Sequence, residues 1–585
     1  MRPRFARIAL DRGWLIGLAT LVLYVWIAPT HIVDGDNAEF ATLGTIGGIA
    51  HPSGYPLYLL WLHATSWLPA ASPAHAAAIA TAVLGAASVV VLHAACRAWG
   101  ARPLAATVAV AILAAAPIVL RIETEAEVFA LNCLVVAAVI WLAALEGPLR
   151  GWRRAPALGL VAGLGLSNHL TCVLIAPVGI LGAIRATREA ALPKPAVIGL
   201  AIAGLLVGLL PYGYAFVAAD TPLSWGHVRS LGHLVALFTR RDYGGPDAFQ
   251  TNGTEVSVAT SIFGLTATLA RTWLWAPLLL GGATLVHRVI RSANGEPRWG
   301  WAMLALSFVL AGPVLVSRFN VAPEGLGLYV CQRFYVLPAM LLAIPIAVGL
   351  TSLAKRIPTT RISERTCIAI AATVGFAAVA GTSLPHILRV HTRAVEAGAR
   401  NMLRSLPADA VVIESADDLH HGAGYVQWAL GERQDVVMVT WTMMSMQWYR
   451  DRVSLRGIVA PPGAAPPLIR LADALLASGK ALFVDQTQTA ILEAFPTYPY
   501  GTLIRVLPHG AKPPSLAEVF ELDKAIYAKF DLDYPRPGPD DEYPTEVHRR
   551  YAATWTVLAQ ALRAAGKDDD ADWALEAARE VGPHP

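Results

Sequence analysis

Long apolar runs alternate with short polar segments along the chain as far as residue 388. A helix needs roughly 20 apolar residues to cross a bilayer, and about eleven segments come near this length. The predicted spans are 14–30, 76–97, 103–121, 127–146, 156–167, 170–185, 196–217, 270–290, 300–317, 335–354 and 366–386. The two shortest are expected to form a tight helical hairpin, at 156–167 and 170–185. The pattern predicts a polytopic α-helical membrane protein.

The periodicity changes after residue 388. Three short apolar stretches bounded by turn residues read as buried strands, at 408–415, 435–441 and 480–486, with a helix expected over 422–431. From residue 513 the pattern is helical, and its small residues resemble one tetratricopeptide (TPR)-like helix pair. We therefore expect a membrane domain over 1–388, an α/β domain over 389–512 and a helical TPR-like tail over 513–585.

Basic residues set the expected orientation. They precede the first span, as Arg2, Arg4, Arg7 and Arg12, and they recur in alternate loops. Because such loops face the cytoplasm, the N-terminus is expected inside, and the polar segment 31–68 outside together with the C-terminal domains. The first apolar run follows basic residues as in a signal peptide, but no small-residue cleavage pattern closes it, so it is expected to remain as a span.

Composition agrees with this class of protein. Hydrophobic residues make up 55% of the chain and charged residues only 15%, which is too apolar for an ordinary soluble protein. The net charge of +4 is small and spread along the chain, so nucleic acid is not an expected partner. The five cysteines have neither disulfide-framework nor metal-ligand spacing.

Polar residues gather in the segments that are expected outside. Burying ionisable groups at membrane depth costs free energy, so a ring of them at one interface indicates a functional site. The alternative is that these segments are solvated outer loops, in which charged residues carry no such cost. These segments are "DGDNAEF" (34–40), "HPSGYPLY" (51–58), "RIETEAEVFALN" (121–132), "LSNHLT" (166–171), "DTPLSWGH" (220–227), "TRRDYG" (239–244) and "CQRFY" (331–335).

In this order the motifs are similar to those of a known family. The chain from Asp34 to Tyr335 resembles the bacterial membrane proteins related to the eukaryotic protein O-mannosyltransferase that modifies plexin-type domains, in the GT-C glycosyltransferase superfamily. Segment 414–439 resembles the domain that follows the membrane-spanning part in the sequences of this family. The chain departs at Asn37-Ala38, where the family commonly has Ser-Gly, and the carboxylate spacing stays intact.

The resemblance implies an enzyme that passes a sugar from a polyprenyl-phosphate carrier to an extracytoplasmic hydroxyl group of a protein or glycan. It implies Asp36 as general base, with Asp34 the second choice. Glu39 is expected to orient Asp36 or bind sugar, but the spacing Asp36-x-x-Glu39 also fits a capping box, and both roles stay open. His51 is expected to contact the donor, or to cap a helix.

Other residues are expected to bind donor or acceptor. The planar guanidinium group of arginine can donate two parallel hydrogen bonds to a phosphate group. Three arginines in the outer segments are therefore candidates for binding the phosphate group of the donor. The full set is His51, Tyr55, Glu127, Asn168, His169, Trp225, Arg240, Arg241, Tyr243, Arg333 and Tyr335. Asn168 and His169 can equally be the polar tip of a turn.

Neighbouring charged residues are given simpler interpretations. Glu123 and Glu127 are spaced to share one helix face, with Glu127 deeper in the membrane. Arg121 is expected to extend from a helix end to the interface. "DDLHH" (417–421) has metal-binding atoms but no second pair at ligand spacing, so a solvated loop is expected there. No cofactor or metal ligand is predicted.

Two other function classes are alternatives to a glycosyltransferase. A transporter would favour polar residues near the membrane midplane and a repeated half, and neither is evident in the sequence. A non-catalytic membrane scaffold for cell-envelope glycoconjugates is compatible with the tail but leaves Asp36 unexplained. The expected enzyme lies in the bacterial inner membrane, with lipid around it and its site facing outward.

Overall fold

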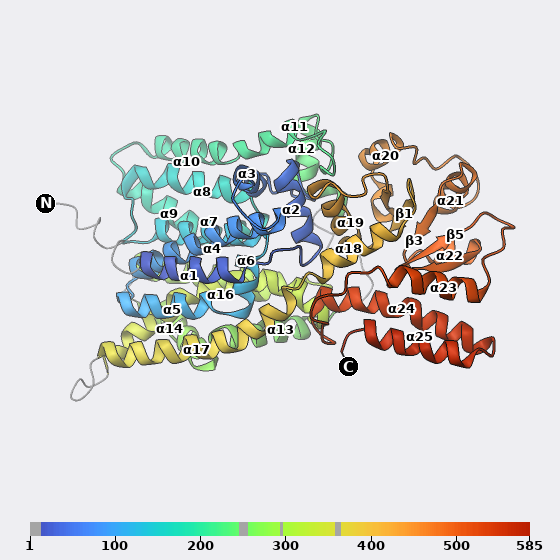
Figure 1. Ribbon diagram of the computed structural model, residues 1–585. Helices are drawn as coiled ribbons and strands as arrows, with labels where there is room; N and C mark the ends of the chain where they lie inside the picture. Colours follow the sequence, from blue (N-terminus) through green and yellow to red (C-terminus); the bar gives the residue numbers. More distant parts are fainter. Residues whose placement is uncertain (1–12, 245–255, 293–295, 357–363, 585) are drawn as a thin grey trace.

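The computed structural model describes residues 13–244, 256–292, 296–356 and 364–584, which form a helical bundle with an α/β part at one end (Figure 1). The basic segment 1–12 lies outside the described residues. The helices of the bundle are α1 (Gly13–Ile27), α2 (Gly35–Ile46), α3 (Pro56–Thr65), α4 (Pro73–Ala98), α5 (Pro103–Ala114), α6 (Pro117–Thr124), α7 (Val128–Ala143), α8 (Arg154–Leu166), α9 (Ala176–Glu189), α10 (Lys194–Gly208), α11 (Tyr214–Val217), α12 (Leu231–Phe238), α13 (Val258–Trp273), α14 (Trp275–Arg291), α15 (Glu296–Val309), α16 (Gly325–Ala354) and α17 (Glu364–Val390).

Local sequence explains how these helices begin and pack. Proline occupies the first turn of α3, α4, α5 and α6, where its missing N–H group costs nothing. Glycines let α8 and α10 touch: a Cβ atom on Gly159 would lie 2.0 Å from the carbonyl oxygen of Ala201. Such small residues allow close backbone contact between helices in a membrane, where packing drives their association.

The described residues contain four helical segments that are long and apolar enough to cross a membrane, namely 73–98, 170–189, 194–217 and 325–354. Two bent pairs raise the number to six if each counts as one span: α5 with α6, at 73°, and α13 with α14, at 108°. The chain is therefore a helical membrane protein, while the expected number of eleven spans stays a prediction. The break at Leu274 falls inside the expected span 270–290.

The C-terminal part contains a five-stranded sheet with the order β2-β1-β3-β5-β4. The three predicted strands are confirmed as β1 (Val411–Glu414), β2 (Val437–Thr440) and β3 (Leu482–Val484), which run parallel. The hairpin of β4 (Thr497–Tyr500) and β5 (Leu503–Val506) was not predicted; its turn contains Gly501 at φ 59°. The helices here are α18 (Ala394–Ser405), α19 (Asp417–Gly424), α20 (Gln447–Ser454), α21 (Pro467–Ala477), α22 (Thr489–Ala494), α23 (Leu516–Tyr527), α24 (Glu542–Ala564) and α25 (Asp568–Val581).

The C-terminal part packs against the start of the bundle. Helix α19 lies against α2, so closely that a Cβ atom on Gly35 would come within 3.2 Å of the Asp417 backbone. The expectation of a solvated loop at 417–421 is therefore wrong, because these residues begin a packed helix. Helix α24 contacts α16, α17 and α18, and α25 packs on α24 (Figure 1). The first polar segment and the C-terminal part thus lie at the same end of the bundle, and the likeness of the tail to a TPR unit stays a prediction.

Two expectations about charged residues near α6 are also wrong. Helix α6 ends at Thr124 and α7 begins at Val128, so Glu123 and Glu127 lie on different elements and share no helix face. Arg121 does not extend to an interface, because it is buried and forms ion pairs with Glu125 and Glu542. Both errors arise because the chain bends between the helices, which turns these residues inward.

Candidate active site

Asp34 fixes the start of α2. Its Oδ1 atom accepts a hydrogen bond from the Asn37 backbone N–H at 2.6 Å, and the Tyr329 hydroxyl donates to its Oδ2 atom. Asp34 is therefore the helix N-cap, a position where aspartate is strongly preferred. The alternative of a capping box between Asp36 and Glu39 is wrong, because the helix starts one residue before Asp36. This cap leaves Asp36 and Glu39 free to project from the first turns of α2.

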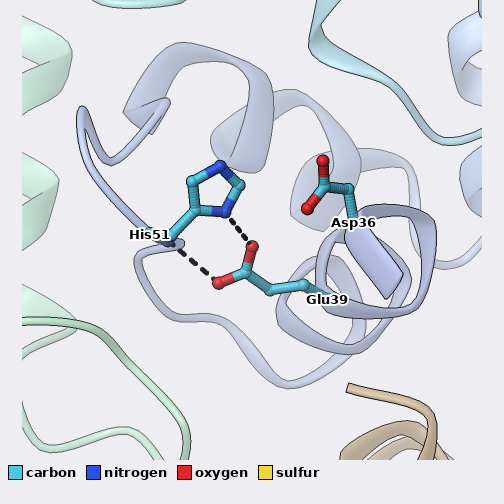
Figure 2. A group of neighbouring side chains, drawn as sticks. All are labelled: Asp36, Glu39 and His51. Atoms are coloured by element: carbon cyan, nitrogen blue, oxygen red, sulfur yellow. Dashed lines mark hydrogen bonds and ion pairs between the residues drawn. The ribbon is translucent and has the colours of Figure 1, made fainter. Parts of the chain in front are cut away.

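Glu39 and His51 form one hydrogen-bonded unit (Figure 2). The Glu39 carboxylate accepts from His51 Nδ1 at 2.5 Å and from the His51 backbone N–H at 2.9 Å. His51 Nε2 lies 3.0 Å from the Tyr55 hydroxyl oxygen. His51 does not cap a helix, because α3 begins at Pro56 with Tyr55 as its N-cap. Glu39 thus sets the orientation of the imidazole from the neighbouring helix.

Arg333 joins two carboxylates. Its Nη1 atom donates to Asp36 Oδ2 and, at 3.0 Å, to Glu127 Oε1. Glu127 is 1% exposed and lies at the start of α7, while Arg333 lies in α16. Three elements that are far apart in the sequence therefore meet at one guanidinium group.

Burial and charge set the protonation of these groups in opposite directions. Burial by itself would raise the pKa of Asp36, but the charges of Arg333 and His51 outweigh it and hold that pKa below its usual value. For Asp34, burial and the charges of Glu125 and Asp36 raise the pKa. The charge of Glu39 overcomes burial and raises the pKa of His51. Asp36 is thus an ionised carboxylate at neutral pH, as a general base must be.

An aromatic wall lies beside this group. The Tyr55 ring stacks on His169, with centroids 5.7 Å apart and 8° between the planes. Phe129 and Phe334 also contact His169, at 4.7 and 6.3 Å between centroids. Asn168 donates to the carbonyl oxygen of Val128 at 3.0 Å, which fixes the turn that carries His169. The structure therefore places His169 at the wall, while the Asn168 amide group supports the turn.

Another side of the group that contains Asp36, Glu39 and His51 is formed by Arg240 and two aromatic residues. Arg240 Nη1 donates to the Pro52 carbonyl oxygen at 2.9 Å, and its guanidinium lies 5.3 Å from the Tyr243 ring centroid. The Tyr243 ring lies 6.3 Å from His51. Trp225 packs on Tyr243 at 5.6 Å between centroids. Arg240 is thus a second cation at the same segment as His51.

Two predicted site residues lie away from this group. Arg241 is exposed and lines a surface groove. The Tyr335 ring stacks on Phe319, at 6.5 Å between centroids, and Tyr335 lies two residues after Arg333 in α16, on another face of that helix. Among the described contacts, none joins either residue to Asp36, Glu39 or His51.

The sequence did not reveal several partners of the site. Tyr329, which holds Asp34, precedes Arg333 by four residues, and this helical spacing could have revealed it. His420 and His421 on α19 line a cavity together with Glu39. Because α19 lies more than 300 residues after α2 in the sequence, no local pattern could predict this contact.

Asp36, Glu39 and His51 could also offer three metal ligands. Their ligand atoms lie within 4.8 Å of one another. However, Asp36 pairs with Arg333, and Glu39 with His51, so each carboxylate already has a cationic partner. The arrangement is that of an ion-pair network.

Comparison with known proteins agrees with this fold. Residues 36–191 match the family described as "Protein O-mannosyl-transferase TMEM260 N-terminal domain". The Mus musculus protein O-mannosyl-transferase TMEM260 is 24% identical over 481 residues, which cover 78% of this chain and 66% of the mouse protein. The Dictyostelium discoideum protein O-mannosyl-transferase tmem260 is 20% identical over 365 residues, covering 58% of this chain and 44% of that protein. The chain thus spans less than two thirds of the length of these relatives.

A solved structure extends the likeness to the fold. ArnT from Cupriavidus metallidurans, bound to undecaprenyl phosphate, superposes with a TM-score of 0.52 and 13% identity, over 88% of this chain and 100% of ArnT. At this identity the likeness concerns the fold alone. The protein is therefore a helical membrane protein with a GT-C-like fold and a domain similar to one of the TMEM260 O-mannosyltransferases.

Proposed function

We propose that the chain is a membrane glycosyltransferase that moves a sugar from a polyprenyl-phosphate donor to an acceptor hydroxyl group. Mannose is the first candidate for that sugar. The ion pair between Asp36 and Arg333 carries this proposal, since it brings a candidate base and a phosphate-binding cation into contact. The domain similar to that of named O-mannosyltransferases and the GT-C-like fold support the same class of enzyme. The proposal places the site at the outer face of a bacterial inner membrane.

Arg333 and Arg240 bind the donor phosphate in this scheme. A guanidinium group donates two parallel hydrogen bonds to phosphate oxygens, and charge assistance makes them strong. The isoprenoid chain stays in lipid beside the aromatic residues Phe129 and Phe334, while the sugar faces the carboxylates. When Arg333 turns to the phosphate, Asp36 loses its partner, and its pKa rises toward that of a more effective base.

Asp36 acts as general base in an inverting displacement. The acceptor oxygen forms a bond to the anomeric carbon as its proton passes to Asp36, and the bond from that carbon to the phosphate oxygen breaks. The products are the glycosylated acceptor and polyprenyl phosphate, whose negative charge Arg333 and Arg240 stabilise. Glu39 acts through His51 as a positioning residue, because it holds the imidazole toward Asp36 (Figure 2).

Reconstitution with labelled donors tests the proposal. Purified protein in lipid bilayers is incubated with polyprenyl-phosphate mannose, and in parallel with other polyprenyl-phosphate sugars, together with a cell-envelope extract as acceptor. Label is expected to leave the lipid fraction and to appear in protein or glycan. If label stays on the lipid for every donor while the protein remains folded, the proposal is wrong.

A further inference from the structure

His169, Thr171 and Asn132 form a chain of hydrogen bonds behind the aromatic wall. The Thr171 backbone N–H donates to His169 Nδ1 at 3.2 Å, and the Thr171 Oγ1 atom lies 2.7 Å from the same nitrogen. Asn132 Nδ2 donates to Thr171 Oγ1 at 3.1 Å. One nitrogen of the imidazole ring is therefore bonded to the protein through its own turn and, through Thr171, to α7.

These contacts decide which nitrogen of the ring carries the hydrogen. A backbone N–H can only donate, so Nδ1 accepts with its lone pair, and the neutral ring carries its hydrogen on Nε2. Because Asn132 donates to the Thr171 hydroxyl oxygen, that hydroxyl group can direct its own hydrogen to Nδ1. Among the described contacts, none occupies Nε2. His169 thus has one free hydrogen-bond donor of fixed position.

The surroundings of His169 keep its ring uncharged. The residue is 7% exposed, and burial lowers its pKa to about 3. The charges of Arg240, His51 and Arg333 add to this shift, so all three cations lie near the ring. A neutral ring with hydrogen on Nε2 can donate to an anion among these cations without adding a further positive charge.

The turn that carries His169 is fixed to two helices of the bundle. The Leu57 backbone N–H in α3 donates to the Ser167 carbonyl oxygen at 3.0 Å. The Ser167 hydroxyl donates to the carbonyl oxygen of Gly208, at the end of α10, at 2.9 Å. The turn is thus held beside the segment that carries Tyr55 and His51, and the ring has a defined place in the site.

His169 lies where the aromatic wall meets the cations. Phe334 contacts its ring and directly follows Arg333 in α16. Tyr55 stacks on the ring, and its hydroxyl oxygen lies 3.0 Å from His51 Nε2. In the proposed donor the phosphate group is the joint between the isoprenoid chain and the sugar. The ring therefore occupies the corresponding position in the site, between the apolar wall and the charged groups.

We infer that His169 donates its Nε2–H hydrogen bond to the phosphate group of a polyprenyl-phosphate ligand, and that Thr171 is a positioning residue that holds the ring in this tautomer. The inference rests on the proposed function and adds to it a neutral donor and the residue that orients it. As the bond from the anomeric carbon to the phosphate oxygen breaks, negative charge gathers on the phosphate, and a hydrogen bond to it becomes stronger. The hydrogen stays on Nε2, so His169 stabilises the leaving group without protonating it.

Two substitutions of His169 separate the Nε2 donor from the rest of the ring. The amide nitrogen of glutamine can take the place of Nε2, whereas that of asparagine comes near the place of Nδ1. The probe is tritium-labelled polyprenyl phosphate without sugar, and its binding is measured on purified full-length protein in lipid nanodiscs. His169→Asn is expected to raise the dissociation constant roughly tenfold, and His169→Gln to stay near the wild-type value. Uncharged polyprenol is the control ligand and should bind equally to all variants.

A second set of variants tests the role of Thr171. Thr171→Val removes the hydroxyl group and should raise the dissociation constant roughly threefold, while Thr171→Ser should restore it. Thr187→Val is the matched control, because the Thr187 hydroxyl donates to a backbone carbonyl within α9. The tautomer is read from the ¹⁵N signals of labelled histidine, with the His169 signals identified by their absence in His169→Gln protein. Thr171→Val should show a mixture of tautomers, and Thr171→Ser and Thr187→Val the wild-type tautomer.

Several results would overturn the inference. Equal binding of polyprenyl phosphate by His169→Gln and His169→Asn would show that the Nε2 donor has no role, and a wild-type ring with hydrogen on Nδ1 would contradict the tautomer. Normal donor binding and sugar transfer in His169→Asn would also overturn the inference and leave the proposed function intact. Binding that falls in His169→Asn, without sugar transfer by the wild type from any donor, would support the phosphate contact and refute the transferase.

Discussion

The guanidinium group of Arg333 donates a hydrogen bond to the carboxylate of Asp36, which lies 297 positions earlier in the chain. The contact links α2, in the first polar segment, to the long helix α16. It keeps Asp36 ionised in the absence of donor, and it places a cation where a phosphate group could replace the carboxylate.

Removal of the Arg333 side chain is expected to weaken use of the donor. Charge-assisted hydrogen bonds contribute about 1.5–3 kcal/mol, so Arg333→Ala should raise the half-saturating donor concentration roughly ten- to a hundredfold. Arg333→Lys should restore activity only in part, because lysine lacks the planar fork. Arg318→Ala, which removes an exposed arginine just before α16, is the control and should behave as wild type. Unchanged donor use in Arg333→Ala would assign the phosphate to Arg240.

Glu542 is expected to stabilise α2 through a chain of contacts. It pairs with Arg121, whose guanidinium lies 3.9 Å from the Tyr329 ring centroid, and Tyr329 donates to the N-cap Asp34. Glu542→Ala leaves Arg121 buried with fewer partners, which costs about 1–3 kcal/mol. We expect a lower melting temperature and faster hydrogen exchange in the first turn of α2.

Glu546→Ala provides the matched control for Glu542. Glu546 lies on the same helix, and its ion pair with Arg549 is partly exposed, so its loss should cost about 0–1 kcal/mol. Exchange in α2 should then stay at the wild-type rate. Equal exchange in the two variants would mean that the tail does not influence the first polar segment.

Asp523 makes the stability of the C-terminal part depend on pH. Burial raises its pKa to about 7, while its Oδ1 atom accepts from the Gly501 N–H at 2.6 Å. Because the folded-state pKa is above the ordinary value of 3.8, the stabilisation is complete below about pH 4 and is lost as the pH rises through 7. Asp523→Asn keeps the acceptor without the charge. It should therefore raise the melting temperature at pH 8 by several degrees and leave it unchanged at pH 4.

The exposed Asp540 supplies the control for this experiment. Asp540→Asn removes the same charge at the surface, so its melting temperature should follow that of the wild type at both pH values. A gain for Asp523→Asn that is equal at pH 4 and pH 8 would show that the carboxyl group does not change its charge in this range.

Local patterns predicted those parts of the structure that depend on neighbouring residues. Apolar runs and turn residues predicted the helical membrane protein and the strands β1, β2 and β3, because burial of a strand or span leaves a local hydrophobic signature. The motifs also predicted one candidate site that contains Asp36, His51, Glu127 and Arg333, and the structure places these residues together.

The remaining features depend on contacts between distant elements. The sequence alone could not show that α19 packs on α2, or that Glu542 reaches Arg121, because each pair is joined only by the folded chain. The bend between α6 and α7 separated Glu123 from Glu127 for the same reason, since tertiary packing decides where a helix breaks. The hairpin β4–β5 was missed although Gly501 marks its turn.

The central claim is that Asp36 is the general base, and the most direct measurement is the rate of sugar transfer by Asp36→Asn protein at saturating donor. A well-placed base contributes about 10²–10⁴ in rate, so transfer should fall by at least two orders of magnitude while expression and melting temperature stay near those of the wild type. Asp34→Asn keeps an oxygen that can cap α2, and should retain most of the activity. Transfer by Asp36→Asn within a few-fold of the wild-type rate would contradict the account, and loss of activity in Asp34→Asn alone would make Asp34 the base.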